Sequence, residues 1–250
     1  MSDSSKIFRR ELPKILLLIV LYALQGLPIG FFLSSIPVIF KKYLTYSEIG
    51  VIMMCTMPFS LKVLWSPFVE FYYSEKFGKR RSWIVPMQLI LCVLLFLLKD
   101  NLESWLIDRR VSLVSYLLTG VIFVITCQDI AVDSWAIEML HPANATYGSS
   151  SQSIGHRIGV FISSTLFISM NSPEFCKRWF GSDELWTLKG FLEAYCWLTL
   201  AVTLYIAVFV PEKDAEILKL QAGKDVKQED EVTMSMTFSI FKDVLMNKSV

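Results

Sequence analysis

Of the 250 residues 54% are hydrophobic and the mean hydropathy is +0.49, which indicates lipid as the surrounding solvent rather than an ordinary soluble domain. The 24 basic and 23 acidic residues nearly cancel, so no excess of positive charge predicts a nucleic-acid partner. The five cysteines form no Cys-x-x-Cys pair and no metal-ligand spacing, so we expect neither a metal nor any other cofactor.

Six apolar stretches are long enough to cross a hydrocarbon core about 30 Å thick. We therefore expect an all-α, polytopic membrane protein with six transmembrane helices. The stretches run from about Leu12 to Phe40, Ile49 to Tyr72, Ser82 to Leu98, Ser112 to Leu140, Tyr147 to Met170 and Leu188 to Val210.

The same pattern divides the chain into three parts. Residues 1–13 would form a cytoplasmic N-terminal segment, residues 14–210 the six-helix transmembrane domain, and residues 211–250 a charged cytoplasmic linker that begins a second unit. With this topology fourteen Lys and Arg residues lie on the side of the N-terminus and eight on the other side. The positive-inside rule therefore favours both termini in the cytosol.

The first two stretches contain prolines and polar residues. Pro28, Pro37 and Pro58 predict kinked helices, which transporters often place near their pathways. Gln25 is expected either to hydrogen-bond a neighbouring helix or to contact a substrate, and Gln88 in the third stretch to hydrogen-bond between helices. Lys62 lies too deep to reach the interface easily and needs an anionic partner, either a carboxylate of the fourth stretch or a phosphate-bearing solute.

The connection after the second stretch carries an acid followed by a basic turn. Glu70 precedes the run Gly78-Lys79-Arg80-Arg81. The simpler interpretation is a positively charged cytoplasmic loop. The loop also resembles the acid and Gly-Arg-Arg loop that major facilitator transporters carry between their second and third helices, which would make it a gating element.

The fourth stretch holds the densest group of polar residues, in the run from Gln128 to Asp133. The helical period places Asp129 and Asp133 one turn apart on one face, near the middle of the membrane. Ionisable residues at such depth are functional candidates, with a structural ion pair as the alternative. We interpret the two carboxylates as a proton or cation site and Gln128 as a possible substrate contact.

The fifth stretch supplies complementary charge. Arg157 is expected either to pair with an aspartate of the fourth stretch or to contact an anionic substrate. His156 fits a hydrogen-bonded interior residue better than a proton relay. Small neighbours such as Gly155 and Gly159 would permit a close helix approach.

Several segments together resemble the acetyl-coenzyme A transporter family, a eukaryotic branch of the major facilitator superfamily. The resemblance runs from about Lys14 to the end of the chain. The segments are Leu24-Gln25-Gly26-Leu27-Pro28-Ile29-Gly30, Pro58-Phe59-Ser60-Leu61-Lys62-Val63-Leu64-Trp65-Ser66-Pro67, Phe77-Gly78-Lys79-Arg80-Arg81-Ser82-Trp83, Gln128-Asp129-Ile130-Ala131-Val132-Asp133-Ser134-Trp135-Ala136 and Glu174-Phe175-Cys176.

This resemblance implies a major facilitator half-bundle that imports acetyl-coenzyme A from the cytosol into the lumen of the endoplasmic reticulum, as a solute:proton symporter. Family members have about twelve spans in two six-helix halves, so the chain corresponds to the N-terminal half and would need a partner half or a second copy. Two departures stand out: Glu70 replaces the usual aspartate, and His156-Arg157 replaces an uncharged pair.

The sequence also allows other functions. A related permease plan would carry another anionic solute such as a muropeptide-like molecule, and a shortened chain could be a non-transporting subunit or a fragment. A membrane-embedded enzyme is less favoured, because the sequence contains no HExxH, GxSxG or GxGD motif.

Overall fold

The computed structural model describes residues 3–74, 77–141, 144–181 and 183–210, and the expected linker 211–250 lies outside this part. All regular secondary structure in the described residues is helical, which confirms the all-α prediction for them. In chain order the elements are α1 (Asp3–Gly30), η1 (Phe31–Ser35), α2 (Ile36–Phe40), α3 (Tyr46–Met53), η2 (Met54–Thr56), α4 (Met57–Ser60), α5 (Lys62–Phe71), α6 (Arg81–Ile107), α7 (Val111–Met139), α8 (Thr146–Val160), η4 (Phe161–Leu166), α9 (Phe167–Asn171), α10 (Pro173–Phe180) and α11 (Leu188–Phe209).

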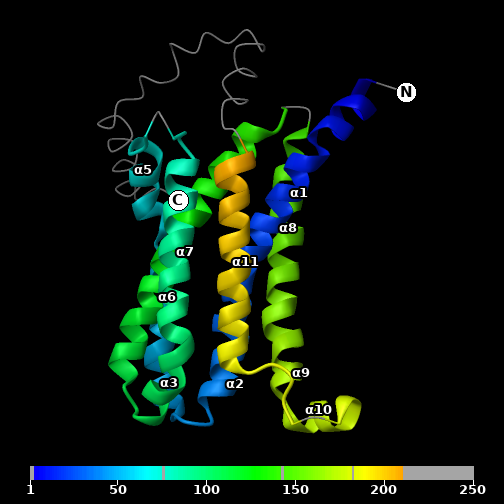
Figure 1. The fold of residues 1–250 in the computed structure, drawn as a ribbon. Coiled ribbons are helices and arrows are strands. Elements are labelled where there is room, and N and C mark those ends of the chain that lie inside the picture. The colour runs from blue at the N-terminus through cyan, green and yellow to red at the C-terminus, as the bar shows by residue number, and fades with distance from the viewer. Residues whose placement is uncertain (1–2, 75–76, 142–143, 182, 211–250) are drawn as a thin grey trace, which may run out of the picture.

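The long helices stand side by side in one bundle (Figure 1). Helix α1 packs along α8, α6 lies between α7 and α11, and α5 packs on α7. The start of α1, helix α5 and the α7–α8 connection lie at one end of the bundle, and the short helix α10 lies across the other end (Figure 1). Helix α1 also contacts α7, so α1, α5, α7 and α8 lie together although they are distant in sequence.

Four segments of the described chain are long and apolar enough to cross a membrane: Arg10–Phe40, Arg81–Ile107, Val111–Met139 and Leu188–Phe209. A fifth is obtained if Tyr46–Ser60 and Lys62–Phe71 are one broken span. The fifth expected stretch, Tyr147 to Met170, forms the continuous helical run α8–η4–α9, but its serines, its glycines and Arg157 leave it too polar to qualify by composition. The structure thus supports four or five spans, and the sixth stays a prediction.

The second expected span is bent where the sequence predicts a kink. The segments on either side of Leu61 meet at 45°. Pro58 lies in the first turn of α4, where it cannot supply a backbone donor to the preceding turn. The break leaves Lys62 as the first residue of α5, directly after the bend. The kink therefore sets the position at which this lysine enters the bundle.

Glycines hold α1 and α8 at backbone contact. A Cβ atom added to Gly26, Gly30, Gly155 or Gly159 would lie 2.2–2.6 Å from an atom of the opposite helix. At Gly26 the nearest atom is the backbone oxygen of His156, at 2.4 Å. Small residues at such spacing are the usual basis of close helix packing in membranes. The seam fixes the height of His156 against α1.

Just beyond the seam both helices contain a π-helical turn. The turns are η1 and η4, which contact each other, and the Ser35 hydroxyl donates a hydrogen bond of 2.6 Å to the backbone oxygen of Ser163. A π turn holds one extra residue relative to an α-helix and often occurs at a functional site. Here the two π turns lie next to each other, one in each of the paired helices.

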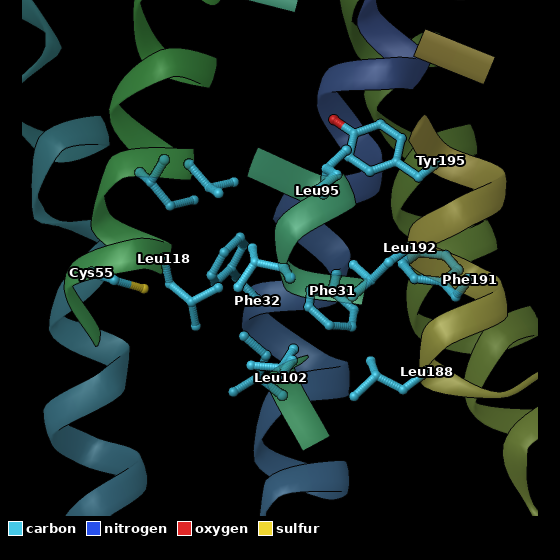
Figure 2. Close-up of a cluster of buried hydrophobic side chains, with 14 of the residues drawn as sticks. Phe31, Phe32, Cys55, Leu95, Leu102, Leu118, Leu188, Phe191, Leu192 and Tyr195 are labelled. Atoms are coloured by element: carbon cyan, nitrogen blue, oxygen red, sulfur yellow. The ribbon is translucent and has the colours of Figure 1, made fainter. Parts of the chain in front are cut away.

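An aromatic and aliphatic cluster that includes Phe31 and Phe32 of η1 fills this part of the bundle (Figure 2). Phe191 stacks on Phe167 with ring centroids 4.3 Å apart and on Phe31 at 5.4 Å. The cluster encloses a cavity of about 20 Å³, which is of the order of one water molecule. No solute of metabolite size fits there, so a solute site must be sought elsewhere.

The glycine seam gives a stability prediction. Gly159→Ala places a methyl group 2.2 Å from the backbone oxygen of Ala23, and neither helix backbone can yield without displacing the other. We expect a loss of about 1–3 kcal/mol, as for an overpacked core. The measurement is the thermal unfolding midpoint of the purified protein in detergent.

Gly120→Ala in α7 is the matched control, because nothing lies within 4 Å of the added Cβ. This substitution should leave the midpoint unchanged or raise it, since alanine favours a helix more than glycine does. Equal midpoints for the two variants would contradict the close α1–α8 contact.

Candidate functional site

Lys62, the first residue of α5, joins two carboxylates of α7. Its ammonium donates hydrogen bonds to Asp129 Oδ2 at 2.9 Å and to Asp133 Oδ2 at 3.2 Å. The side chain of Asp129 is 2% exposed, while those of Asp133 and Lys62 are 31% and 37% exposed. The predicted carboxylate partner of Lys62 is therefore confirmed, and both predicted carboxylates lie at one site.

Two further helices bind the second oxygen of Asp133. Asp133 Oδ1 accepts a hydrogen bond from the Tyr22 hydroxyl of α1 at 3.0 Å and another from Gln152 Nε2 of α8 at 2.8 Å. Together with Lys62 of α5, these contacts make Asp133 the point at which four helices meet. Neither Tyr22 nor Gln152 was predicted, since each is an ordinary residue in its own stretch and only the α1–α8 seam brings them to one carboxylate.

Three polar groups beside this network have no protein partner within the described residues. They are Oδ1 of Asp129, both amide atoms of Gln25 and Nε2 of His156. His156 contacts the Tyr22 ring edge-on, with ring centroids 5.4 Å apart. The hydrogen bond between neighbouring helices proposed for Gln25 is therefore not found in the described part of the chain, which leaves its substrate alternative.

The other two residues predicted to contact a substrate are placed differently. Gln128 is buried on α7, beside Asp129 in sequence. Arg157 is exposed on α8, and none of the described carboxylates lies within ion-pair distance of it. Of the two alternatives for Arg157, the pairing with an aspartate is therefore not found among the described residues, and the substrate contact stays a prediction.

The predicted gating loop forms a second polar cluster at the end of the bundle that holds α5. Arg80 donates to both oxygens of Glu70, with Nη2 at 2.9 Å from Oε1, and its Nε lies 3.0 Å from Glu138 Oε2. Lys79 pairs with Glu70 at 2.7 Å. Gly78 has φ of 101°, which a side chain would strain. The cluster ties the end of α5 to the start of α6 and to α7.

Arg81, the remaining residue of the predicted loop, points elsewhere. Its guanidinium donates to the backbone oxygen of Ala207 on α11 and lies 5.1 Å from the centroid of the Phe77 ring. Arg80, by contrast, is 2% exposed. Burial lowers the pKa of Arg80, but its hydrogen bonds with Glu70 and Glu138 outweigh this effect and raise the pKa above its ordinary value. Arg80 is thus a permanent cation that both carboxylates need.

Removal of the central cation should destabilise the bundle. Lys62→Met leaves Asp129 and Asp133 one turn apart without a counter-charge, so we expect a loss near the lower end of about 3–5 kcal/mol, since Lys62 and Asp133 are partly exposed. Adding Asp129→Asn to the same chain should restore part of the loss. Chemical denaturation of the two variants measures the difference.

Lys177→Met is the control for Lys62, because this lysine and its partner Asp183 are both exposed. It should leave the transition unchanged. A double variant no more stable than Lys62→Met would contradict repulsion between the carboxylates.

The basic loop gives a second comparison. Arg80→Ala leaves two carboxylates without their shared buried partner and should cost about 3–5 kcal/mol. Lys79→Ala removes a partly exposed pair with Glu70 and should cost less than about 1 kcal/mol. The ranking is read from thermal midpoints, and similar losses for the two variants would argue against Arg80 as the centre of the cluster.

Known proteins resemble this chain over most of its length. A family profile described as Acetyl-coenzyme A transporter 1 matches residues 14–249. An uncharacterized protein of Schizosaccharomyces pombe is 33% identical over 224 residues, which cover 87% of this chain and 43% of the relative. An uncharacterized membrane protein of Saccharomyces cerevisiae is 31% identical over 234 residues, or 84% of this chain and 42% of the relative.

A bacterial relative carries a functional name. The anhydromuropeptide permease of Escherichia coli is 24% identical over 200 residues, which cover 78% of this chain and 38% of the permease. The chain thus spans less than half the length of these relatives. With apolar helices long enough to cross a membrane and a family profile over nearly its whole length, the chain belongs to the acetyl-coenzyme A transporter family of multi-pass membrane transporters.

Proposed function

We propose that the chain forms part of a secondary transporter that moves acetyl-coenzyme A across the endoplasmic reticulum membrane, from the cytosol to the lumen. The observation that carries the proposal is the central lysine, which is held within the bundle by two carboxylates and is still 37% exposed. An ionisable residue within a transmembrane segment costs free energy and is therefore a functional candidate in a membrane protein. The family profile supplies the class of solute.

Anion recognition would rest on two cations from different helices. Lys62 on α5 and Arg157 on α8 are both accessible, and acetyl-coenzyme A carries several phosphate groups. A guanidinium suits bidentate binding of phosphate, and an ammonium acts as a point charge. Gln25 and Gln128 would supply neutral hydrogen bonds to the uncharged parts of the solute.

Coupling would rest on competition for Lys62. An incoming anion must attract Lys62 away from Asp129 and Asp133, which hold it at 2.9 and 3.2 Å. A proton on one carboxylate weakens that hold. A solute:proton symporter follows, in which the aspartates bind the coupling ion.

The loop cluster would act as a gate. Glu70, Gly78, Lys79, Arg80 and Arg81 connect the end of α5 to neighbouring helices in the present conformation. Movement of α5 toward a different conformation must break the Glu70–Arg80 pair. The gate would therefore favour one conformation until the free energy of solute binding offsets the cost of breaking the Glu70–Arg80 pair.

The larger architecture follows from the family. Residues 14–210 would form six spans of a major facilitator half-bundle, with the polar run α8–η4–α9 as the fifth, shielded from lipid on one side by α1. Such transporters work by rocking one six-helix unit against another, so a partner half or a second copy would complete the site. The distribution of Lys and Arg supports both termini in the cytosol.

A different anionic solute is the second candidate. The similarity to the anhydromuropeptide permease favours a muropeptide-like molecule as that alternative. A non-transporting subunit or a fragment would keep the family fold without uptake. A membrane-embedded enzyme is less supported, because the family profile and the named permease both describe transport.

The test is uptake of radiolabelled acetyl-coenzyme A into proteoliposomes that contain the purified chain. We expect saturable uptake that Lys62→Ala reduces at least about tenfold, equivalent to about 1.4 kcal/mol of lost binding, with Lys177→Ala unchanged as the exposed control. Uptake competed by unlabelled coenzyme A but not by an anhydromuropeptide identifies the solute class. The reverse competition would favour the muropeptide-like alternative, and no uptake from folded protein would favour a subunit or fragment.

A further inference from the structure

We propose that the two central aspartates have different roles: Asp129 binds the coupling proton, and Asp133 stays ionised as the fixed counter-ion of Lys62. This assignment rests on the proposed transport function for its physiological meaning, but not for its structural basis. The sequence alone treats the two carboxylates as equivalent, since they lie one turn apart on α7. The hydrogen bonds separate them.

Asp133 has donors at both oxygens. Tyr22 and Gln152 donate to Oδ1 at 3.0 and 2.8 Å, and Lys62 donates to Oδ2 at 3.2 Å. Each of these donors stabilises the carboxylate over the neutral acid. The side chain is also 31% exposed, so water can solvate the remaining lone pairs. A proton on Asp133 would weaken three hydrogen bonds that the ionised carboxylate accepts.

Asp129 is in the opposite situation. Its side chain is 2% exposed, Lys62 is its one donor among the described residues, and Oδ1 accepts no hydrogen bond from them. Burial of a carboxylate with one oxygen unpaired favours the neutral acid. A proton can be added at Oδ1 without breaking the bond from Lys62 to Oδ2. Asp129 is therefore the carboxylate that can change its charge at the lower cost.

The surrounding helices do not reverse this difference. Lys62 from α5, Tyr22 from α1 and Gln152 from α8 contact the pair, and His156 of α8 packs against Tyr22. Helix α6 carries no charged residue between Arg81 and Lys99. Tyr22 of α1 lies at the level of Asp133 on α7. Gln25 is about one helical turn further along α1, and because α7 runs in the opposite direction, this turn leads toward the level of Asp129. His156 lies beside Gly26 in the seam.

Proton binding changes the charge of the site by one. Lys62, Asp129 and Asp133 together carry −1 when both aspartates are ionised, and 0 after one proton from the aqueous phase converts Asp129 to the neutral acid. Lys62 then has one charged partner instead of two. An anionic solute meets a site that no longer repels it, so proton and solute each favour the binding of the other, as thermodynamic linkage requires.

The assignment is tested by infrared difference spectroscopy of the protein in liposomes, with the pH stepped down in the absence of solute. A protonated carboxyl group has a C=O stretch that the ionised carboxylate lacks, and in neutral Asp129 the carbonyl oxygen would be Oδ2, which keeps the hydrogen bond from Lys62. We expect such a band in the wild-type protein, its loss in Asp129→Asn and its retention in Asp133→Asn. Asp129→Glu, which keeps a carboxyl group, should shift the band rather than remove it.

Loss of the band in Asp133→Asn with retention in Asp129→Asn overturns the assignment, as does absence of the band from the wild-type protein. Because no solute is present, the outcome is independent of the acetyl-coenzyme A assay. Where that assay shows uptake, Asp129→Asn should retain exchange of labelled for unlabelled solute while losing the dependence of uptake on a pH gradient. Unchanged pH-driven uptake in Asp129→Asn also overturns the proposal.

Discussion

A positive charge in the interior of a lipid-embedded bundle is the constraint on which much of this structure depends. A cation among packed helices is costly unless the fold supplies negative charge to it. The two aspartates on α7 do so, and they require support in turn, because a second carboxylate brings repulsion as well as attraction. Tyr22 and Gln152 provide that support for Asp133 from two further helices.

Backbone geometry makes the arrangement possible. The bend at Leu61 admits Lys62 to the bundle at the start of a new helix. The glycines of the α1–α8 seam bring two backbones into contact, which places Tyr22 and Gln152 at one height. Larger residues at the seam would separate the helices and move both donors away from Asp133. The hydrogen bonds to Asp133 thus depend on the close packing of small residues between α1 and α8.

The sequence predicted those features that depend on one segment and its period. The all-α class, the kink near Pro58, the proximity of Asp129 and Asp133 and the need of Lys62 for an anionic partner all follow from spacing and from the cost of buried charge. Gln88 was expected to bond between helices, and it accepts a hydrogen bond from Thr203 of α11 at 2.8 Å. Features that depend on the rotation of one helix against another were not predictable. For Arg157 the sequence left a pairing with an aspartate and a contact with substrate both open, and the structure shows no such pair among the described residues.

The paired π turns have a consequence for how α1 and α8 divide their surfaces. An extra residue turns the following part of a helix by about 100° relative to an uninterrupted α-helix. The side chains beyond each turn therefore do not continue the face that precedes it. Before the turns, Tyr22 and Gln152 contact Asp133, while Phe31, the first residue of η1, and Phe167, which follows η4, enter the aromatic cluster around Phe191. One pair of helices can in this way border a charged, partly exposed site over one part of its length and an aromatic core over another part.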